Sequence, residues 1–258
     1  MKEVILKELR KVEEEKDVKI LYACESGSRA WGFESKNSDY DVRFIYIHKT
    51  NWYLSVDKKR DVIDLFSDDK ELDFSGWDLK KTLLLLKKSN PPLLEWFQSP
   101  VVYQKEEFFY NEFRKLMNLY YSPKSCLYHY LHMAKRNHKE YLKGDIVQLK
   151  KYFYVLRPVL ACLWIEKNLG MVPTEFYKLV DGIVKDVQLK KDIDHLILLK
   201  QNGLEKDTGR KIDSISNFLD FQINRLREEE NSVALERSNK ILNQFFLNTL
   251  KEINGSNL

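Results

Sequence analysis

Two acidic side chains, Asp39 and Asp41, stand one residue apart in the segment "NSDYDVRFIYIH". Successive side chains of a strand alternate between its two faces, so both carboxylates would project to the same side. The apolar side chains that would project to the other side are Val42, Phe44 and Tyr46. Two carboxylates this close repel each other unless they share a proton or a cation lies between them. The pair is therefore a candidate cage for Mg²⁺, which takes carboxylate and phosphate oxygens as ligands; a simple turn in the polar stretch is the alternative.

A glycine and a serine, Gly27 and Ser28, lie a dozen residues before these acids and directly after an apolar run. Glycine permits a tight turn and a close approach of the backbone to another group. Ser28 supplies a hydroxyl and an amide at the expected start of a helix, where N–H groups favour phosphate. A strand, a Gly-Ser pair and then Asp-x-Asp on the next strand predict a triphosphate-binding site beside a metal site.

The elements that must hold these residues follow from the spacing of apolar side chains. Residues 2–16 show helical spacing, and a second helix is expected to end before Pro91. Short apolar runs typical of strands lie at residues 18–24, 41–48, 61–66 and 71–74. After about residue 105 helical periodicity dominates, up to a long segment over residues 214–251. The sequence predicts an α+β protein, with a catalytic α/β domain over residues 1–105 and a helical domain over residues 106–258.

The composition is typical of a globular protein with a charged surface. The chain has 258 residues, of which 43% are hydrophobic and 32% charged, and its formal net charge is +4. So mild a charge is compatible with polyanionic partners without establishing nucleic-acid binding. Three widely spaced cysteines favour a reduced, cytoplasmic protein. The acidic N-terminal segment lacks the apolar core of a signal peptide, and no apolar run is long enough to span a membrane, so we expect no membrane partner.

The segment "ESGSRAWGFESKNSDYDVRFIY" resembles the nucleotidyltransferase superfamily typified by DNA polymerase beta, in which Gly-Ser precedes Asp-x-Asp. It looks more narrowly like the bacterial and phage nucleotidyltransferase family named after RNA-repair-associated, polymerase-beta-like proteins. Two later blocks, "LDFSGWDLKKTLLLLKKSNPPLLEWFQSPVVY" and "KKYFYVLRPVLACLWIE", look like downstream blocks of the same family. The resemblance covers most of residues 18–170. It implies a small mixed sheet with helices, an NTP substrate and a pair of Mg²⁺ or Mn²⁺ ions.

The resemblance also implies a third carboxylate on a neighbouring strand, which completes one metal site and helps to deprotonate the attacking hydroxyl. We expect Asp73 to take this role because its strand-like stretch ends just before a helix. Asp64 and Asp78 are the alternatives, and Asp78 suits a helix N-terminus electrostatically. Asp39, Asp41 and Asp73 would then be the catalytic and metal-binding residues, and a hydroxyl would attack the α-phosphate of the NTP and release pyrophosphate.

Further side chains are candidates for contact with the nucleotide. Arg29 follows the Gly-Ser pair and could reach a phosphate or simply face solvent. Trp31 and Phe33 could stack on a base, although packing of the short helix against the sheet is favoured. Arg43 shares a face with Asp41 and is interpreted as a counter-charge that holds the carboxylates apart.

In the helical half, Lys150, Tyr154 and Arg157 fall at i, i+4 and i+7, which predicts one polar helix face. These residues are candidates for phosphate or base contacts, with a solvated stripe as the alternative. His129 and His132 lie one helical turn apart, and without a third ligand they favour surface packing over metal binding.

The predicted function is transfer of a nucleoside monophosphate from an NTP to an acceptor hydroxyl. The acceptor stays open among an RNA 3′ end, a small hydroxylated molecule and a side-chain hydroxyl of another protein. Lys135 is a candidate for the acceptor or nucleotide side. A non-catalytic nucleotide-binding module on the same fold is the alternative from another class; the presence of Gly27, Ser28, Asp39 and Asp41 favours catalysis.

Overall fold

The computed structural model describes residues 1–67, 71–203, 208–226 and 238–255. The chain forms two compact units that are interleaved in sequence. Unit 1 comprises Met1–Gly27, Asp39–Tyr121 and Leu235–Leu258, and unit 2 comprises Ser28–Ser38 and Ser122–Ala234. The domains predicted above, 1–105 and 106–258, are continuous; that division stays a prediction.

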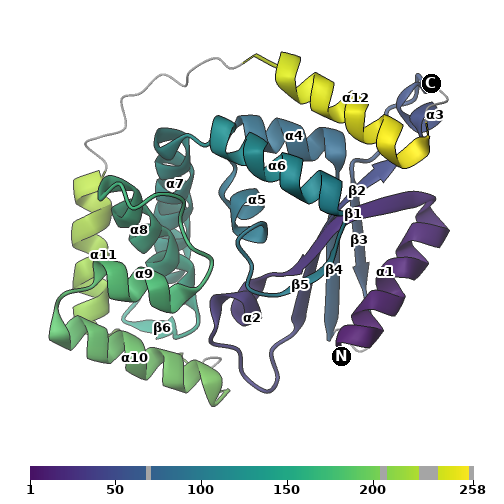
Figure 1. Cartoon of the computed structure of the whole chain (residues 1–258). Helices are drawn as coiled ribbons and strands as arrows, with labels where there is room; N and C mark the ends of the chain where they lie inside the picture. Colours follow the sequence, from purple (N-terminus) through teal and green to yellow (C-terminus); the bar gives the residue numbers. More distant parts are fainter. Residues whose placement is uncertain (68–70, 204–207, 227–237, 256–258) are drawn as a thin grey trace. The chain divides into compact units, whose positions relative to one another are not determined.

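Unit 1 is built on a five-stranded mixed sheet with the strand order β3-β4-β2-β1-β5 (Figure 1). In chain order the strands are β1 (Val18–Glu25), β2 (Tyr40–His48), β3 (Val62–Phe66), β4 (Leu72–Asp78) and β5 (Val102–Lys105). β2 and β4 run parallel, whereas the other neighbouring pairs are antiparallel. Within the parallel pair, Asp41 lies beside Asp73 at one end and Tyr46 lies beside Asp78 at the other.

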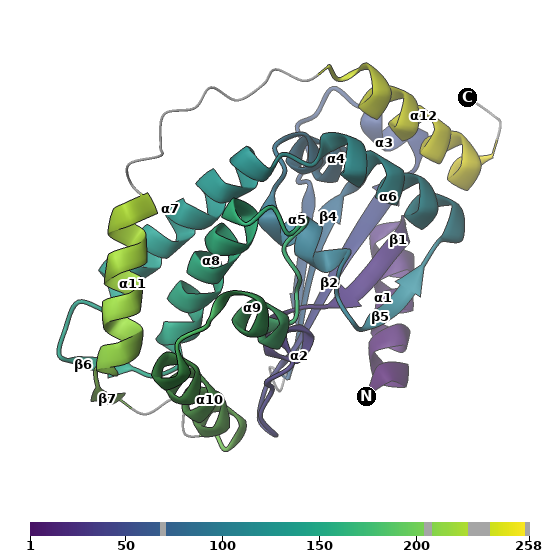
Figure 2. The same ribbon diagram turned by 60° about the vertical axis from the view of Figure 1, so that its left-hand side comes forward.

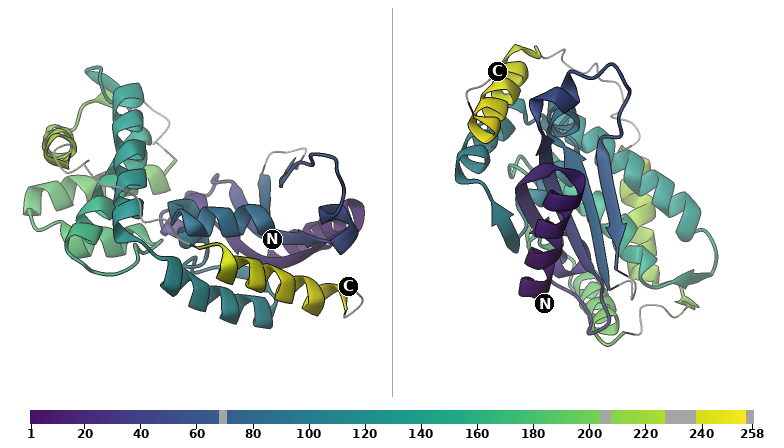
Figure 3. Two further views of the ribbon diagram at one scale, coloured as in Figure 1. Left: turned by 90° about the horizontal axis from the view of Figure 1, so that it is seen from above. Right: turned by 90° about the vertical axis from the view of Figure 1, so that its right-hand side faces the viewer.

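One face of this sheet packs on α1 (Lys2–Lys16), as Figures 1 and 3 show. The apolar side of α1 meets alternate residues of β2 in the core; these buried residues include Ile5, Leu9, Val12, Val42, Phe44 and Tyr46. The predicted alternation of β2 is therefore confirmed, because its even-numbered apolar side chains fill the core beneath α1. The other face of β2 at its start is left to Asp41 and Arg43.

The remaining helices of unit 1 are α3 (Thr50–Tyr53), α4 (Leu79–Lys87), α5 (Pro91–Trp96), α6 (Glu107–Tyr120) and α12 (Lys240–Asn254). The helix expected to end before Pro91 is confirmed as α4, and a further helix that was not expected, α5, begins at Pro91. Two caps explain this: the Asp78 side chain accepts from Lys80 N at the start of α4, and Asn90 accepts from Leu93 N at the start of α5. β5 was missed because its four residues are only partly buried.

Unit 2 is helical, as predicted for this part of the chain (Figure 2). Its elements are α7 (Pro123–Tyr141), β6 (Ile146–Gln148), α8 (Lys151–Glu166), α9 (Phe176–Ile183), α10 (Val187–Gln201), β7 (Thr208–Arg210) and α11 (Asp213–Leu226). α8 packs against α7, α9 and α11 and is buried on nearly every side. The predicted helical segment 214–251 corresponds to α11 and α12, and residues 227–237 between them lie outside the described residues. None of the helices that the structure describes is long and apolar enough to cross a membrane.

Candidate active site

The parallel pairing of β2 with β4 places two carboxylates side by side, Asp41 and Asp73. Arg43 joins them: its Nη2 donates to Asp41 Oδ1 at 2.7 Å and to Asp73 Oδ2 at 2.9 Å. The other terminal nitrogen, Nη1, donates to the main-chain carbonyl of Asp73 at 3.0 Å. Arg43 is thus a counter-charge, as interpreted, but the acid that it joins to Asp41 is Asp73, and it does not hold the carboxylates apart. One cation holds together two acids that come from neighbouring strands.

Asp39 precedes β2, which begins at Tyr40, and its side chain is exposed. The expectation that both acids project from the strand therefore holds for Asp41 alone. Burial is the main cause that raises the pKa of Asp41 above its ordinary value; the Arg43 charge opposes this rise, and the charges of Asp73 and Asp39 add to it. Two like charges thus act on Asp41 at the start of β2, which favours a further cation there.

The backbone of Gly27 packs closely against Asp41 of this acidic cluster. Its φ is +58°, in the left-handed region that glycine adopts most readily. A Cβ atom at this position would lie 1.9 Å from Asp41 Oδ2 and 2.8 Å from Asp41 Cγ. The neighbouring Ser26 N–H also donates to the carbonyl of Asp41 at 2.8 Å. Only glycine therefore leaves room for the Asp41 carboxylate in this position, and Gly27 begins the short helix α2 (Gly27–Trp31), which contains Ser28.

Glu25, at the end of β1, was not identified from the sequence. It is 1% exposed, and its Oε1 accepts from the main-chain N–H of Asp41 at 2.8 Å. Its Oε2 accepts from the hydroxyl of Tyr103 on β5, and its carbonyl accepts from Ser99 Oγ at 2.6 Å. Glu25 thus fixes the backbone at Asp41 from the adjacent strand. The only signal in the sequence was an acid at the end of an apolar run, which is also common at exposed strand ends.

The two alternatives for the third carboxylate lie elsewhere in the sheet. Asp64 is on the edge strand β3, where it accepts from Ser75 Oγ at 2.7 Å and from Arg60 Nη2 at 2.5 Å. Asp78 is 1% exposed at the far end of β4 and caps α4. Of the three acids considered, Asp73 is the register partner of Asp41.

The donor chemistry at the start of β2 and β4 fits a hard divalent cation. Two carboxylates converge on a single positive charge, and both keep part of their surface accessible, 28% for Asp41 and 29% for Asp73. Carboxylate oxygens are the ligands that Mg²⁺ prefers. Over the described ranges, no group of three or more His, Cys, Asp or Glu side chains is close enough to hold a metal ion by itself. A bound ion would therefore take part of its ligands from substrate phosphates.

The residues that follow Gly27 belong to unit 2 and pack within it. Arg29 Nη2 donates to the carbonyl of Ser38 at 2.7 Å, which closes the loop between these two residues. The ring of Phe33 stacks on Phe153 of α8 with centroids 4.5 Å apart, and the Arg157 guanidinium lies 5.1 Å from the ring centroid of Trp31. Packing of the two aromatic residues is confirmed. Their partners, however, belong to unit 2, whereas packing against the sheet had been expected.

The predicted polar face of α8 is only partly present. Lys150 precedes α8 and is half-buried, and Tyr154 is 39% exposed. Arg157, by contrast, is 3% exposed, and its Nη2 donates to the carbonyls of Pro173 at 3.3 Å and Thr174 at 3.2 Å. The prediction was wrong for Arg157 because α8 is enclosed on nearly every side, so its i+7 position faces the interior.

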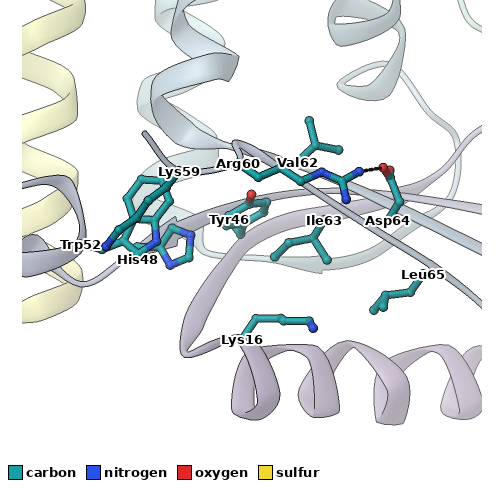
Figure 4. Close-up of a pocket in the computed structure, with 10 residues that line it drawn as sticks. All are labelled: Lys16, Tyr46, His48, Trp52, Lys59, Arg60, Val62, Ile63, Asp64 and Leu65. Carbon is teal, nitrogen blue, oxygen red and sulfur yellow. Dashed lines mark hydrogen bonds and ion pairs between the residues drawn. The ribbon is translucent and has the colours of Figure 1, made fainter. Parts of the chain in front are cut away.

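A cavity of about 390 Å³ lies at the opposite end of β2 from Asp41 (Figure 4). Tyr46, His48 and Trp52 line it together with the cationic side chains of Lys59 and Arg60. The imidazole of His48 stacks on Trp52 with centroids 3.9 Å apart. Burial, assisted by the Lys59 charge, lowers the pKa of His48 to about 4. This end of the strand is therefore an aromatic cluster in which His48 is neutral at pH 7.

Comparisons with known proteins agree with the resemblance. The chain matches the model of the RNA repair pathway DNA polymerase beta family over residues 1–248. It is 47% identical over 255 residues to "Uncharacterized protein YcgL" of Bacillus subtilis (strain 168), covering 98% of both chains. Among solved structures, a nucleotidyltransferase-like protein from Exiguobacterium sibiricum 255-15 aligns with 95% of this chain and 88% of its own, at 12% identity and a TM-score of 0.33. At that TM-score the structural match adds nothing to the assignment.

Proposed function

Because the chain belongs to the RNA repair pathway DNA polymerase beta family, we propose that it is a metal-dependent nucleotidyltransferase. It transfers a nucleoside monophosphate from an NTP to an acceptor hydroxyl and releases pyrophosphate. The observation that carries this proposal is the convergence of Asp41 and Asp73 on one cation, with Gly27 closely packed against Asp41. Two carboxylates brought together in this way suit a reaction at a phosphate that is bound through divalent ions.

Asp39, Asp41 and Asp73 are the proposed ligands of the ions, and Asp73 is proposed to take up the proton of the attacking hydroxyl. Mg²⁺ or Mn²⁺ bound there would polarise the phosphate and stabilise charge on the entering and leaving oxygens. Arg43 neutralises part of the charge of Asp41 and Asp73, which lowers the cost of holding them side by side. Glu25 keeps the Asp41 backbone in place, so the carboxylate does not drift when the charge around it changes.

Gly27 and Ser28 are the proposed contacts of the triphosphate. Arg29 supports them in the proposal by holding the following loop closed through Ser38. Lys150 and Tyr154 remain proposed contacts of the nucleotide.

Arg157 is proposed to influence the nucleotide indirectly, since its guanidinium is engaged with the carbonyls of Pro173 and Thr174. A buried donor of this kind positions the chain around it, and at 3% exposure it has almost no surface with which to meet a phosphate.

The test compares two aspartates of the sheet, Asp73 and Asp64. Both would be changed to Asn, which keeps the size of the side chain and removes its charge. Each variant is incubated with α-labelled NTPs, Mg²⁺ or Mn²⁺, and RNA, metabolite and protein fractions, and the transfer of label and the release of pyrophosphate are measured. We expect Asp73→Asn to lose activity by about a thousandfold and Asp64→Asn to stay close to wild type. Equal activity of the two variants would remove Asp73 from the site.

A further inference from the structure

Unit 2 carries a concentrated positive charge on α7 and the residue pair after it. Residues 123–143 contain five Lys and Arg side chains and a single acid, Glu140. The whole chain has an excess of only four positive charges, so this segment accounts for all of it. The mild net charge of the protein therefore conceals a strongly basic patch, since the rest of the sequence is balanced.

The basic side chains of this segment follow one stripe of the helix. His132, Lys135, Arg136 and Lys139 are at i, i+3, i+4 and i+7, so their side chains lie on the same face over two turns. At the rise of an α-helix these turns span roughly 10 Å. A cavity of about 510 Å³ opens on this face, and all six residues that line it are basic: His132, Lys135, Arg136, His138, Lys139 and Lys143. We call these six residues the basic stripe.

Helix stability explains only part of this arrangement. Cations in the last turn interact favourably with the helix dipole, and His138 and Lys139 are in that turn. His138 also pairs with Asp220 of α11, with 2.9 Å between Nε2 and Oδ1. Lys135 and Arg136 lie before the last turn, where the dipole contributes little. The helix dipole therefore does not account for these two cations, and a polyanionic ligand is a reason for their place on the same face as Lys139.

An exposed aromatic ring adjoins the stripe. Tyr128 lies one turn before His132, is 48% exposed, and its ring centroid is 4.2 Å from that of His132. A positive groove beside an aromatic ring is the arrangement by which proteins bind single-stranded nucleic acid, with phosphates on the cations and a base stacked on the ring. A protein partner fits less well, because protein interfaces are depleted in lysine and need an apolar centre. Every residue that lines this cavity is instead basic.

We propose that the basic stripe binds the phosphate backbone of a single-stranded nucleic acid and that Tyr128 stacks on one of its bases. The binding is a property of unit 2 and does not depend on catalysis. Its consequence for the reaction, that the acceptor hydroxyl is carried by a nucleic-acid strand, rests on the proposed function.

The experiment measures binding of the full chain to a fluorescent single-stranded RNA of about 20 nucleotides, without NTP or divalent ions, over a range of salt concentrations. The test variant carries Arg136→Gln, Lys139→Gln and Lys143→Gln, and the control variant carries Lys167→Gln, Lys185→Gln and Lys191→Gln. All six positions are exposed in unit 2, and both variants lose three positive charges. We expect the test variant to bind about tenfold more weakly than the control, with a slope of log K against log salt shallower by about 2. Tyr128→Leu should weaken binding by roughly tenfold and leave that slope unchanged.

Competition identifies the class of ligand. Single-stranded DNA or RNA should displace the labelled strand more effectively than duplex RNA or polyglutamate. Equal weakening of the two triple variants would overturn the proposal, and so would polyglutamate that competes as well as the single strand. Asp73→Asn should bind RNA like wild type. If binding depends on the basic stripe but no transfer is found with any acceptor, the proposed function fails and the binding surface stands. If transfer occurs but the test variant binds RNA normally, the proposed function stands and the basic stripe is not the binding surface.

Discussion

Two aspartates of the sheet in unit 1, Asp41 and Asp78, both have a raised pKa but differ in the groups that surround them. Burial raises the pKa of both above the ordinary value for an aspartate. The oxygens of Asp78 are used by donors of the fold, since Tyr53 OH donates to Oδ2 at 2.5 Å and Lys80 N donates to Oδ1 at 2.8 Å. Asp41 instead faces the like charges of Asp73 and Asp39 and is balanced by a single guanidinium.

This difference shows that a raised pKa alone does not identify a functional acid. An acid whose oxygens are saturated by neutral donors gains nothing from a further cation, and its role is to hold the fold. An acid that is shielded from water beside other acids is stabilised by any cation that can reach it. The same sheet therefore contains a structural aspartate and a candidate catalytic aspartate, and mutations should separate them.

The largest effect is expected for Asp41→Asn, which should lower nucleotidyl transfer by about a thousandfold or more because it removes a proposed metal ligand. Its thermal stability without divalent ions should be equal to or above that of wild type at pH 7. The sign follows from the raised pKa: folding disfavours the ionised form of Asp41, so this group opposes folding at every pH above its folded pKa. A neutral amide removes that penalty. Retained transfer together with a lowered melting temperature would instead make Asp41 a structural residue like Asp78.

Gly27→Ala tests whether the approach of the backbone to Asp41 matters. The added Cβ would collide with the Asp41 carboxylate, so either the carboxylate or the start of α2 must move. We expect transfer to fall by about a hundredfold, since a misplacement of about 1 Å near a reacting group has effects of this size. Stability should fall by about 1–2 kcal/mol because alanine resists a positive φ.

Gly170→Ala is the matched control for Gly27→Ala. Gly170 has a φ of +89° but no atom within 4 Å of an added Cβ, so only backbone strain is changed there. Steady-state kinetics and thermal melting on both variants decide between the two effects. Similar kinetics of the two variants would show that contact with Asp41 is not required for transfer.

Asp78→Ala should show the opposite pattern to Asp41→Asn. It removes the cap of α4 and leaves the hydroxyl of Tyr53 without this acceptor, which together should cost about 2–4 kcal/mol of stability. Transfer per folded molecule should be unchanged, as measured by kinetics well below the melting temperature. Asp78→Asn keeps an acceptor oxygen and should lose less than half as much stability. A large loss of transfer in this milder variant would contradict the structural role of Asp78.

Much of the structure around Asp41 could be predicted from the sequence. The spacing of apolar residues gave the faces of β2, and the spacing of Gly27 and Asp41 indicated a strand, a turn and a second strand. The pairing of Asp41 with Asp73 could not be predicted from local spacing alone, because the whole sheet determines which strands are neighbours. The expected position of Asp73 came from the resemblance to a family, and the parallel register of β2 with β4 supports it.

The parts that could not be predicted depend on contacts distant in sequence. Glu25 reaches Tyr103 across 78 residues, and nothing local distinguishes it from an exposed acid at a strand end. Arg157 falls at a polar position of an i, i+4, i+7 pattern, yet its guanidinium is buried. Periodicity describes one helix by itself, whereas the exposure of a face is decided by the helices packed around it.

The smallest effect is expected at the end of β2 that lies beside Asp78 of β4, where His48 stacks on Trp52 (Figure 4). The pKa of His48 is lowered to about 4 in the folded chain, compared with 6.5 ordinarily, so between these values the unfolded chain binds more protons. Stability should therefore fall as the pH drops from about 6.5 towards 4, and His48→Phe, which keeps a ring against Trp52 and does not titrate, should lack this part of the decline. Because His48 is half-buried, the loss of unfolding free energy from pH 7 to pH 5 should differ between the two proteins by about 1 kcal/mol or less. Melting curves of both proteins at several pH values measure it, and parallel curves would show that His48 titrates normally. Transfer at pH 7 should be the same in both, since His48 and Asp41 lie seven residues apart on one strand, roughly 23 Å at the rise of a β-strand.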